Sequence, residues 1–69
     1  MATYKYIEIV GTSPDGFEDA VKNAVKDAGE TLHGMSWVEV MDQRCRVEGN
    51  SVVEFQVICK IAFKVMRDS

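Results

Sequence analysis

Apolar and polar residues alternate most regularly near the C-terminal end of the chain, from Val52 to Val65. Successive side chains of a strand point to opposite faces of its sheet, so a period of two predicts a strand with one apolar face. The even-numbered positions include four polar residues, Glu54, Gln56, Lys60 and Lys64. The odd-numbered positions are all apolar, and we expect them to face the core: Val53, Phe55, Val57, Cys59, Ile61, Phe63 and Val65.

A period of three to four residues follows the only proline of the chain and predicts an amphipathic helix. Either Ser13 caps its N-terminus, or Asp15 does so with Glu18 closing a capping box. Gly34 is a natural stop, which gives a helix of about eighteen residues. One face of this helix is expected to be buried, and its small alanines allow a sheet to approach closely. The apolar positions are Phe17, Ala20, Val21, Ala24, Val25, Ala28 and Leu32.

Two further strands are predicted on either side of the helix. Tyr4 to Val10 is rich in aromatic and branched residues and is expected to end at Gly11. Ser36 to Val47 predicts the second strand, with a bulge or bend where polar residues interrupt its alternation between Asp42 and Arg46. The sequence Glu-Gly-Asn-Ser at 48–51 predicts a tight turn that leads directly into the last strand.

The order strand, helix, strand, strand predicts an α+β fold with one helix against a three-stranded sheet. If the sheet is antiparallel, the last strand lies in the middle, because the first two run in the same direction. Fourteen residues of strand extend about 45 Å, whereas the helix covers only about 27 Å. The sheet must therefore wrap around the helix or meet other subunits, and we predict a homo-oligomer.

The composition limits the class of protein. With 69 residues, 46% of them hydrophobic, the chain is expected to form one domain, 1–69, that needs partner subunits or a ligand for stability. A net charge of −3 disfavours nucleic acid and anionic membranes as partners. The two cysteines, Cys45 and Cys59, form no disulfide framework or metal pair, and ordinary thiols are expected. No leader or membrane span is apparent, which favours the cytoplasm.

The residue types make an enzyme hard to build. The single histidine, His33, lies near the end of the helix and is interpreted as a basic group at a helix C-terminus. No phosphate loop, dinucleotide motif or metal spacing occurs in the sequence. The candidate binding residues are the only tryptophan, Trp37, and the amide of Gln56, with Lys60 and Lys64 on the same strand face. Each also has a simpler interpretation, as packing or as a solvated surface residue.

Four segments together resemble the dodecins over nearly the whole chain. They are Val10-Gly11-Thr12-Ser13-Pro14, Glu18-Asp19-Ala20-Val21, Trp37-Val38-Glu39-Val40 and Phe55-Gln56-Val57 continuing to Lys60, Phe63 and Lys64. The resemblance implies a sheet wrapped around its helix and a hollow spherical homododecamer that binds flavins in pairs at subunit contacts. It also implies that Trp37 stacks on the flavin ring and that Gln56 binds its polar edge. Bacterial members favour FMN, and some also bind coenzyme A.

The sequence departs from the dodecin pattern at two positions. Cys45 follows Arg44 where bacterial dodecins have glycine, and Lys64 stands where an arginine is frequent. We expect Arg44 or Lys64 to lie near a flavin phosphate. The resulting hypothesis is a flavin-storage protein without catalytic activity, which binds FMN or a related flavin (riboflavin or FAD) and quenches it. The alternatives are an oligomer without a ligand, in which Trp37 is interface packing, and a small flavin-dependent enzyme.

Overall fold

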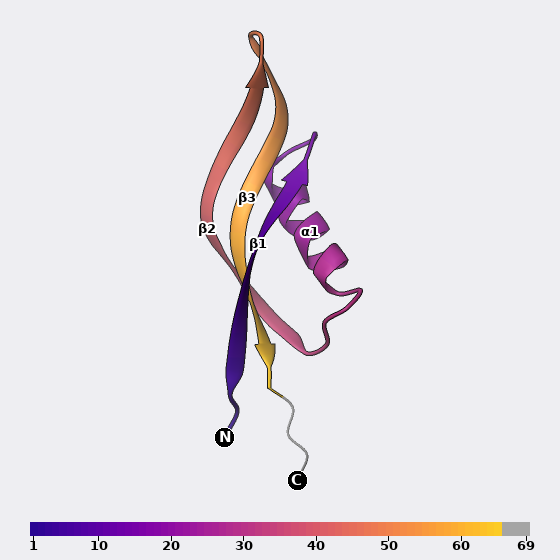
Figure 1. Ribbon diagram of the computed structural model, residues 1–69, viewed down its shortest axis with the longest axis vertical. Helices are drawn as coiled ribbons and strands as arrows, with labels where there is room; N and C mark the ends of the chain where they lie inside the picture. Colours follow the sequence, from indigo (N-terminus) through magenta and orange to yellow (C-terminus); the bar gives the residue numbers. More distant parts are fainter. Residues whose placement is uncertain (66–69) are drawn as a thin grey trace.

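The structure, a computed structural model, describes residues 1–65 and contains three strands and one helix in the predicted order (Figure 1). The expected single domain, 1–69, therefore includes four residues that lie outside the described part. The elements are β1 (Tyr4–Ser13), α1 (Phe17–Ala28), β2 (Met35–Glu48) and β3 (Ser51–Lys64). The predicted strand-helix-strand-strand fold, with a three-stranded antiparallel sheet, is confirmed.

β3 lies between β1 and β2, as the antiparallel arrangement requires. It pairs with β1 from Phe55 to Lys64 and with β2 over nearly its whole length. Gly49, with φ of 61°, and Asn50 form the two-residue turn between β2 and β3, which confirms the predicted hairpin. The tip of this hairpin projects beyond both β1 and α1 (Figure 1).

The pairing of β2 with β3 is irregular at three places. Register shifts occur between Met35 and Trp37, between Val40 and Asp42, and between Arg46 and Val47. The residues from Asp42 to Arg46, where the sequence predicted a bulge or bend, pair in regular register with β3, and the second and third shifts lie directly before and after them. A bulge adds a residue on one strand only and increases the local twist, which bends a long hairpin.

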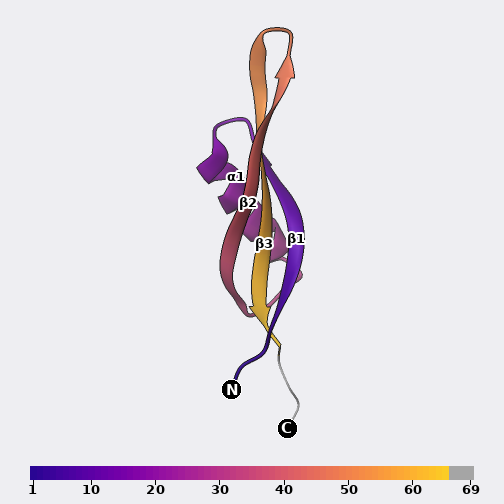
Figure 2. The same ribbon diagram turned by 90° about the vertical axis from the view of Figure 1, so that its left-hand side faces the viewer.

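The core lies between α1 and one face of the sheet (Figure 2). Val57, Cys59 and Ile61 are fully buried there, which confirms the central part of the predicted core face. α1 packs on β1 and β3 through Ala20 and Ala24. The approach is so close that a Cβ atom at Gly11 would lie 2.3 Å from the Ala20 carbonyl oxygen. The sequence therefore needs glycine at this position of β1.

Both predicted caps of the helix are wrong. α1 begins at Phe17, and its N-cap is Gly16, which makes no side-chain hydrogen bond. Ser13 instead ends β1, which continues through Gly11 rather than ending there. Its buried hydroxyl donates to Asp19 Oδ2 at 2.7 Å and accepts from the Asp15 amide at 2.9 Å. Ser13 thus ties the loop to the first turn of the helix without capping it.

The helix is also shorter than predicted. It ends at Ala28, and the Gly29 amide donates to the Val25 carbonyl at 2.9 Å. Gly34, with φ of 78°, lies in the loop that leads into β2 and does not end the helix. Twelve residues of helix cover about 18 Å, whereas the described chain is 56 Å long. More of the sheet is therefore left uncovered than the sequence indicated. Within residues 1–65, no helix has the length and apolar character needed to cross a bilayer.

Candidate functional site

The sheet face opposite α1 carries a group of aromatic side chains, Tyr4, Tyr6 and Trp37, here called the aromatic cluster. The ring centroids of Tyr4 and Trp37 are 4.7 Å apart, and those of Tyr6 and Trp37 are 6.1 Å apart in an edge-on arrangement. The edge-on geometry of Tyr6 and Trp37 is one that aromatic pairs prefer, whereas the ring of Tyr4 is tilted by 53° from the indole. Trp37 nevertheless remains 42% exposed. A large flat side chain is thus ordered at the surface instead of being buried in the core.

The position of Trp37 follows from the local chain path. It comes directly after the first bulge of β2 and lies opposite Ala62 of β3, which in turn lies opposite Tyr6 of β1. Ala62 is fully buried although it occupies an even-numbered position, on the face away from the helix. The rings of Tyr6 and Trp37 on either side explain this burial. The small alanine lets both rings lie close to the sheet.

A chain of hydrogen bonds holds the indole of Trp37. The indole Nε1–H donates to the Tyr6 hydroxyl at 3.0 Å, and this hydroxyl donates to Glu39 Oε1. The bond to Glu39 is the main cause that raises the pKa of Tyr6 above its ordinary value, while the bond from Trp37 acts in the opposite direction. Each of the three side chains comes from β1 or β2 and reaches across the central strand.

Gln56 belongs to a second group, the polar ladder, formed by Arg44, Gln56, Glu54, Arg46 and Glu48 near the hairpin end. Arg44 Nε donates to Gln56 Oε1 at 2.5 Å, and Gln56 Nε2 donates to Glu54 Oε1 at 2.7 Å. A guanidinium only donates and a carboxylate only accepts, so these neighbours fix which way the amide points. One N–H and one oxygen lone pair of Gln56 remain for another partner.

The four predicted site residues lie at two separate places in the protomer. Arg44 and Gln56 are directly opposite each other on β2 and β3. Lys64 is exposed at the other end of β3, opposite Tyr4, and thus on the face and near the end where Trp37 lies. Gln56 is six residues from Ala62, the partner of Trp37, which corresponds to about 20 Å along the strand. One protomer therefore does not bring Trp37 and Gln56 together.

Both cysteines of the chain are free thiols. Cys59 is buried beneath α1, and burial raises the pKa of its thiol, against a backbone hydrogen bond from Gly11 that lowers it. Cys45 is exposed and pairs with Phe55 in regular strand register. Its φ is not positive, so cysteine in place of glycine here requires no unusual backbone conformation.

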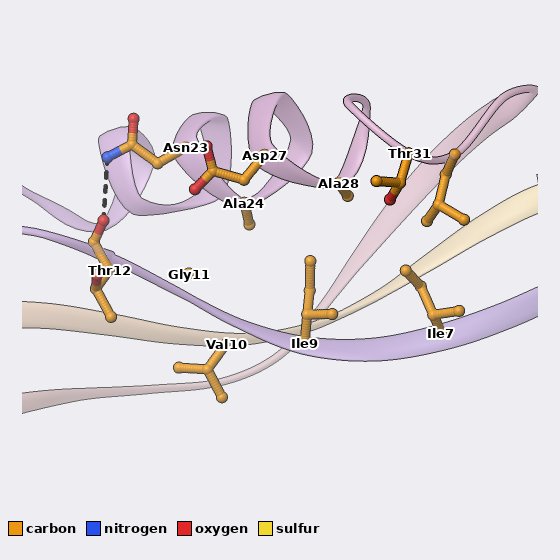
Figure 3. A pocket seen from close by; sticks show the side chains of 11 residues that line it. Ile7, Ile9, Val10, Gly11, Thr12, Asn23, Ala24, Asp27, Ala28 and Thr31 are labelled. Atoms are coloured by element: carbon orange, nitrogen blue, oxygen red, sulfur yellow. Dashed lines mark hydrogen bonds between the residues drawn. The ribbon is translucent and has the colours of Figure 1, made fainter.

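A separate open groove of about 600 Å³ runs between α1 and the edge strand β1 (Figure 3). Ile7 and Ile9 point toward the helix, whereas Val10 points to the opposite face (Figure 3). Asn23 lines this groove, and its side-chain amide already donates a hydrogen bond to the Thr12 carbonyl at 3.0 Å. Within residues 1–65, no three side chains of the kinds that bind metal ions come together. The residues that line this groove include no aromatic side chain, whereas the aromatic cluster and the amide of Gln56 lie on the other face of the sheet.

Tyr6 and Glu39 are the site neighbours that the sequence interpretation missed. Tyr4 and Tyr6 alternate on one strand, and Trp37 and Glu39 alternate on another, so each pair shares a face. Placing the last strand in the middle puts both pairs on the two sides of that strand. The pattern was therefore present in the sequence, but the register that brings Tyr6 opposite Trp37 was not.

Comparison with known proteins identifies the family. A sequence model of the family described as Dodecin matches residues 3–66. The chain belongs to the dodecin family. The dodecin of Thermus thermophilus is 37% identical over 62 residues, which cover 90% of each chain. A protein of Mycobacterium tuberculosis named Calcium dodecin is 29% identical over 65 residues, which cover 94% of this chain and 92% of that protein.

Solved dodecin structures share the fold of this protomer. The dodecin of Streptomyces coelicolor superposes with a TM-score of 0.93 at 42% identity, covering 97% of this chain and 96% of that one. The dodecin of Streptomyces davaonensis gives 0.92 at 35% identity, with 96% and 97% covered. Among the similar structures are variants of the Thermus thermophilus dodecin in which a tryptophan was replaced by phenylalanine, or an arginine by alanine.

Proposed function

We propose that this dodecin stores and sequesters a flavin, FMN or the related riboflavin or FAD, in the cytoplasm. The flavin ring lies between subunits of a homododecamer and stacks on Trp37. Gln56 binds the polar edge of the ring, and Arg44 or Lys64 lies near the phosphate of the side chain. Coenzyme A is a second ligand to be tested in the same way.

The observation that carries this proposal is the exposure of Trp37 on an ordered aromatic cluster. Tryptophan rings are usually largely buried in a soluble domain, but this one is held at the surface by Tyr4 and Tyr6. A flat aromatic ligand would cover the exposed ring. Membership of the dodecin family makes a flavin the ligand to test first.

The separation of Trp37 from Gln56 supports a slot built by several subunits. About 20 Å of strand lies between the two positions, which is longer than the three-ring system of a flavin. One flavin can contact both residue types only if they come from different protomers. The uncovered sheet and the exposed apolar side chains on it favour the same conclusion, because such surface is normally covered by a partner. Assembly and flavin binding should therefore be linked.

Enclosure between subunits must supply most of the affinity. Aromatic stacking contributes about 0.5–1.5 kcal/mol per pair beyond the burial of area. Ligand sites that bind tightly bury most of the ligand surface and add a few fixed polar groups. The Gln56 amide is such a group, since Arg44 and Glu54 already hold its orientation.

The chemistry expected of this site is protection of the flavin without turnover. A flavin supplies redox and light-driven chemistry when it is bound. An electron-rich indole against its ring quenches the excited state by electron transfer, and enclosure between subunits excludes substrates. We therefore propose that the protein is not an enzyme.

The test is a titration of the purified apoprotein with FMN, with flavin fluorescence and the mass in solution recorded together. We expect quenching on binding, a dodecameric mass, and an affinity that Trp37→Ala lowers by more than about tenfold while the mass stays unchanged. This large effect is expected because the substitution removes the indole on which the flavin ring stacks. A parallel titration with riboflavin measures what the phosphate contributes.

Three outcomes contradict the proposal in different ways. Unchanged FMN fluorescence with the wild-type protein would favour an oligomer without a ligand. Equal affinity in Trp37→Ala would remove the stacking role. Reduction of bound flavin by a nicotinamide donor, faster than that of free flavin, would favour the flavin enzyme instead.

A further inference from the structure

The indole of Trp37 has two kinds of contact within its own protomer, and only one of them fixes its orientation in the ring plane. The ring contacts with Tyr4 and Tyr6 limit where the indole lies. The hydrogen bond from its Nε1–H to the Tyr6 hydroxyl, at 3.0 Å, determines which edge of the indole points toward β1. A hydrogen bond has a directional requirement that aromatic packing alone lacks.

The Tyr6 hydroxyl is itself held in place. It donates to Glu39 Oε1, and a carboxylate accepts only, so the hydroxyl proton points toward Glu39. A lone pair of the Tyr6 oxygen is thereby left to face the indole N–H. The order of donors and acceptors, from Trp37 through Tyr6 to Glu39, is fixed by the chemistry of its two ends.

We propose that Tyr6, held by Glu39, is a positioning residue that presets the orientation of the Trp37 indole for stacking on the flavin. This inference rests on the proposed function, because it concerns the same binding site. The effect of Tyr6 on flavin binding comes through the orientation of Trp37. A side chain that is ordered before the ligand arrives loses less conformational entropy on binding, which increases affinity without a new contact.

The two tyrosines of the aromatic cluster provide a matched pair of variants. Tyr6→Phe keeps a ring beside Trp37 and removes only the hydroxyl that accepts from the indole. Tyr4→Phe removes a hydroxyl from the other neighbouring ring, which is outside the chain of hydrogen bonds. Any general effect of losing a surface phenol should be common to both variants, whereas the positioning effect should occur in Tyr6→Phe alone.

The first measurement uses the apoprotein and needs no flavin. The chain has one tryptophan, so its indole N–H gives a single resonance in a spectrum of ¹⁵N-tryptophan-labelled protein. We expect Tyr6→Phe to move this proton resonance upfield, because the hydrogen bond is lost, and Tyr4→Phe to leave the hydrogen-bonded position in place. Glu39→Ala should produce a smaller shift in the same direction, and no further shift in the Tyr6→Phe background.

The second measurement is the affinity for FMN. We expect Tyr6→Phe to weaken binding by about threefold to tenfold, the range of one net hydrogen bond. If the wild-type protein binds FMN but Tyr6→Phe leaves either the indole resonance or the FMN affinity unchanged, the inference about Tyr6 is wrong. The proposed function is not contradicted by that result. If the wild-type protein does not bind FMN, the proposed function fails, and the role of Tyr6 in flavin binding fails with it.

Discussion

The two faces of the sheet differ in what covers them. On one face, α1 closes over Val57, Cys59 and Ile61, and none of these side chains is exposed. On the other face, Tyr4, Tyr6, Val10 and Trp37 keep between 42% and 51% of their surface exposed. The same strands thus contribute a closed core and an open aromatic surface, because side chains alternate between the faces.

This difference separates the residues that make the fold from those available for binding. A domain of this size buries only about 60% of the surface of its unfolded chain. The face beneath α1 therefore has few buried contacts to lose, and a substitution there should change the free energy of unfolding directly. The aromatic face adds little to the stability of one protomer, so changes there should affect ligand binding instead.

The largest effect is expected from overfilling the helix face at Gly11. In Gly11→Val, the new Cβ would lie 2.3 Å from the Ala20 carbonyl oxygen and 2.7 Å from Ala24 Cβ. The helix would have to move away from β1, which should lower the free energy of unfolding by about 3 kcal/mol or more. Chemical denaturation followed by circular dichroism measures the change.

Gly16→Ser is the matched control for this substitution. A Cβ atom at Gly16 has no neighbour within 4 Å, and serine is a favourable N-cap residue. Its stability should be equal to that of the wild type or slightly higher. If Gly11→Val were as stable as Gly16→Ser, the close approach of helix and sheet would not be what this core depends on.

A smaller loss of stability is expected from Ser13→Ala. Together with Arg46→Ala, this variant compares polar contacts on the two faces of the sheet. The Ser13 hydroxyl is buried and bonded to Asp15 and Asp19, so its loss should cost about 1–2 kcal/mol. Arg46→Ala removes ion pairs with Glu48 and Glu54 from an exposed position, where solvent screens them, and should cost less stability than Ser13→Ala. Thermal unfolding of both variants checks the order, and a reversed order would contradict the comparison.

The sequence predicted the helix face of the sheet better than the extent of the helix. The alternation in β3 is a local pattern, and the antiparallel rule placed this strand in the middle. The end of α1 has a local signal that the sequence interpretation missed, because Gly29 directly follows Ala28 as its C-cap. Leu32 continues the helical spacing, but the chain must turn back between Gly29 and Gly34 to start β2. This requirement of the tertiary fold overrides the local preference.

For the candidate site, the residue types identified candidate binding residues, but they did not identify the side chains that contact them. Trp37 and Gln56 stood out because an indole and an amide are unusual at exposed strand positions. Their partners depend on register between strands that are distant in sequence. Tyr6 and Trp37 are 31 positions apart, and only the pairing of both with Ala62 places the phenol beside the indole. The contact between Trp37 and a neighbouring subunit stays a prediction, because it depends on how two protomers meet and not on the register within one.

The smallest expected effect is a shift in the pKa of Tyr6, and its titration tests the hydrogen bonds on the aromatic face. The chain has two tyrosines, so in a Tyr4→Phe background the ultraviolet absorbance of phenolate measures Tyr6 alone. We expect a pKa above the ordinary value of 10.0, because the neutral hydroxyl donates to Glu39 and a phenolate would lose that bond beside a carboxylate. The register also places Glu8, Lys60 and Lys64 on this face, and the hydrogen bond from Trp37 opposes the rise in the pKa of Tyr6.

Replacing Glu39 separates its effect from that of the other charges around Tyr6. Glu39→Ala in the same background should lower the pKa of Tyr6, since the largest cause of the shift is removed. The folded protein holds the Tyr6 proton more tightly than the unfolded chain, so this contribution to stability is present below pH 10 and is lost as the pH rises through the raised pKa. An unchanged titration in Glu39→Ala would mean that Tyr6 does not donate to Glu39. The aromatic face would then be no more ordered around Trp37 than ring packing alone makes it.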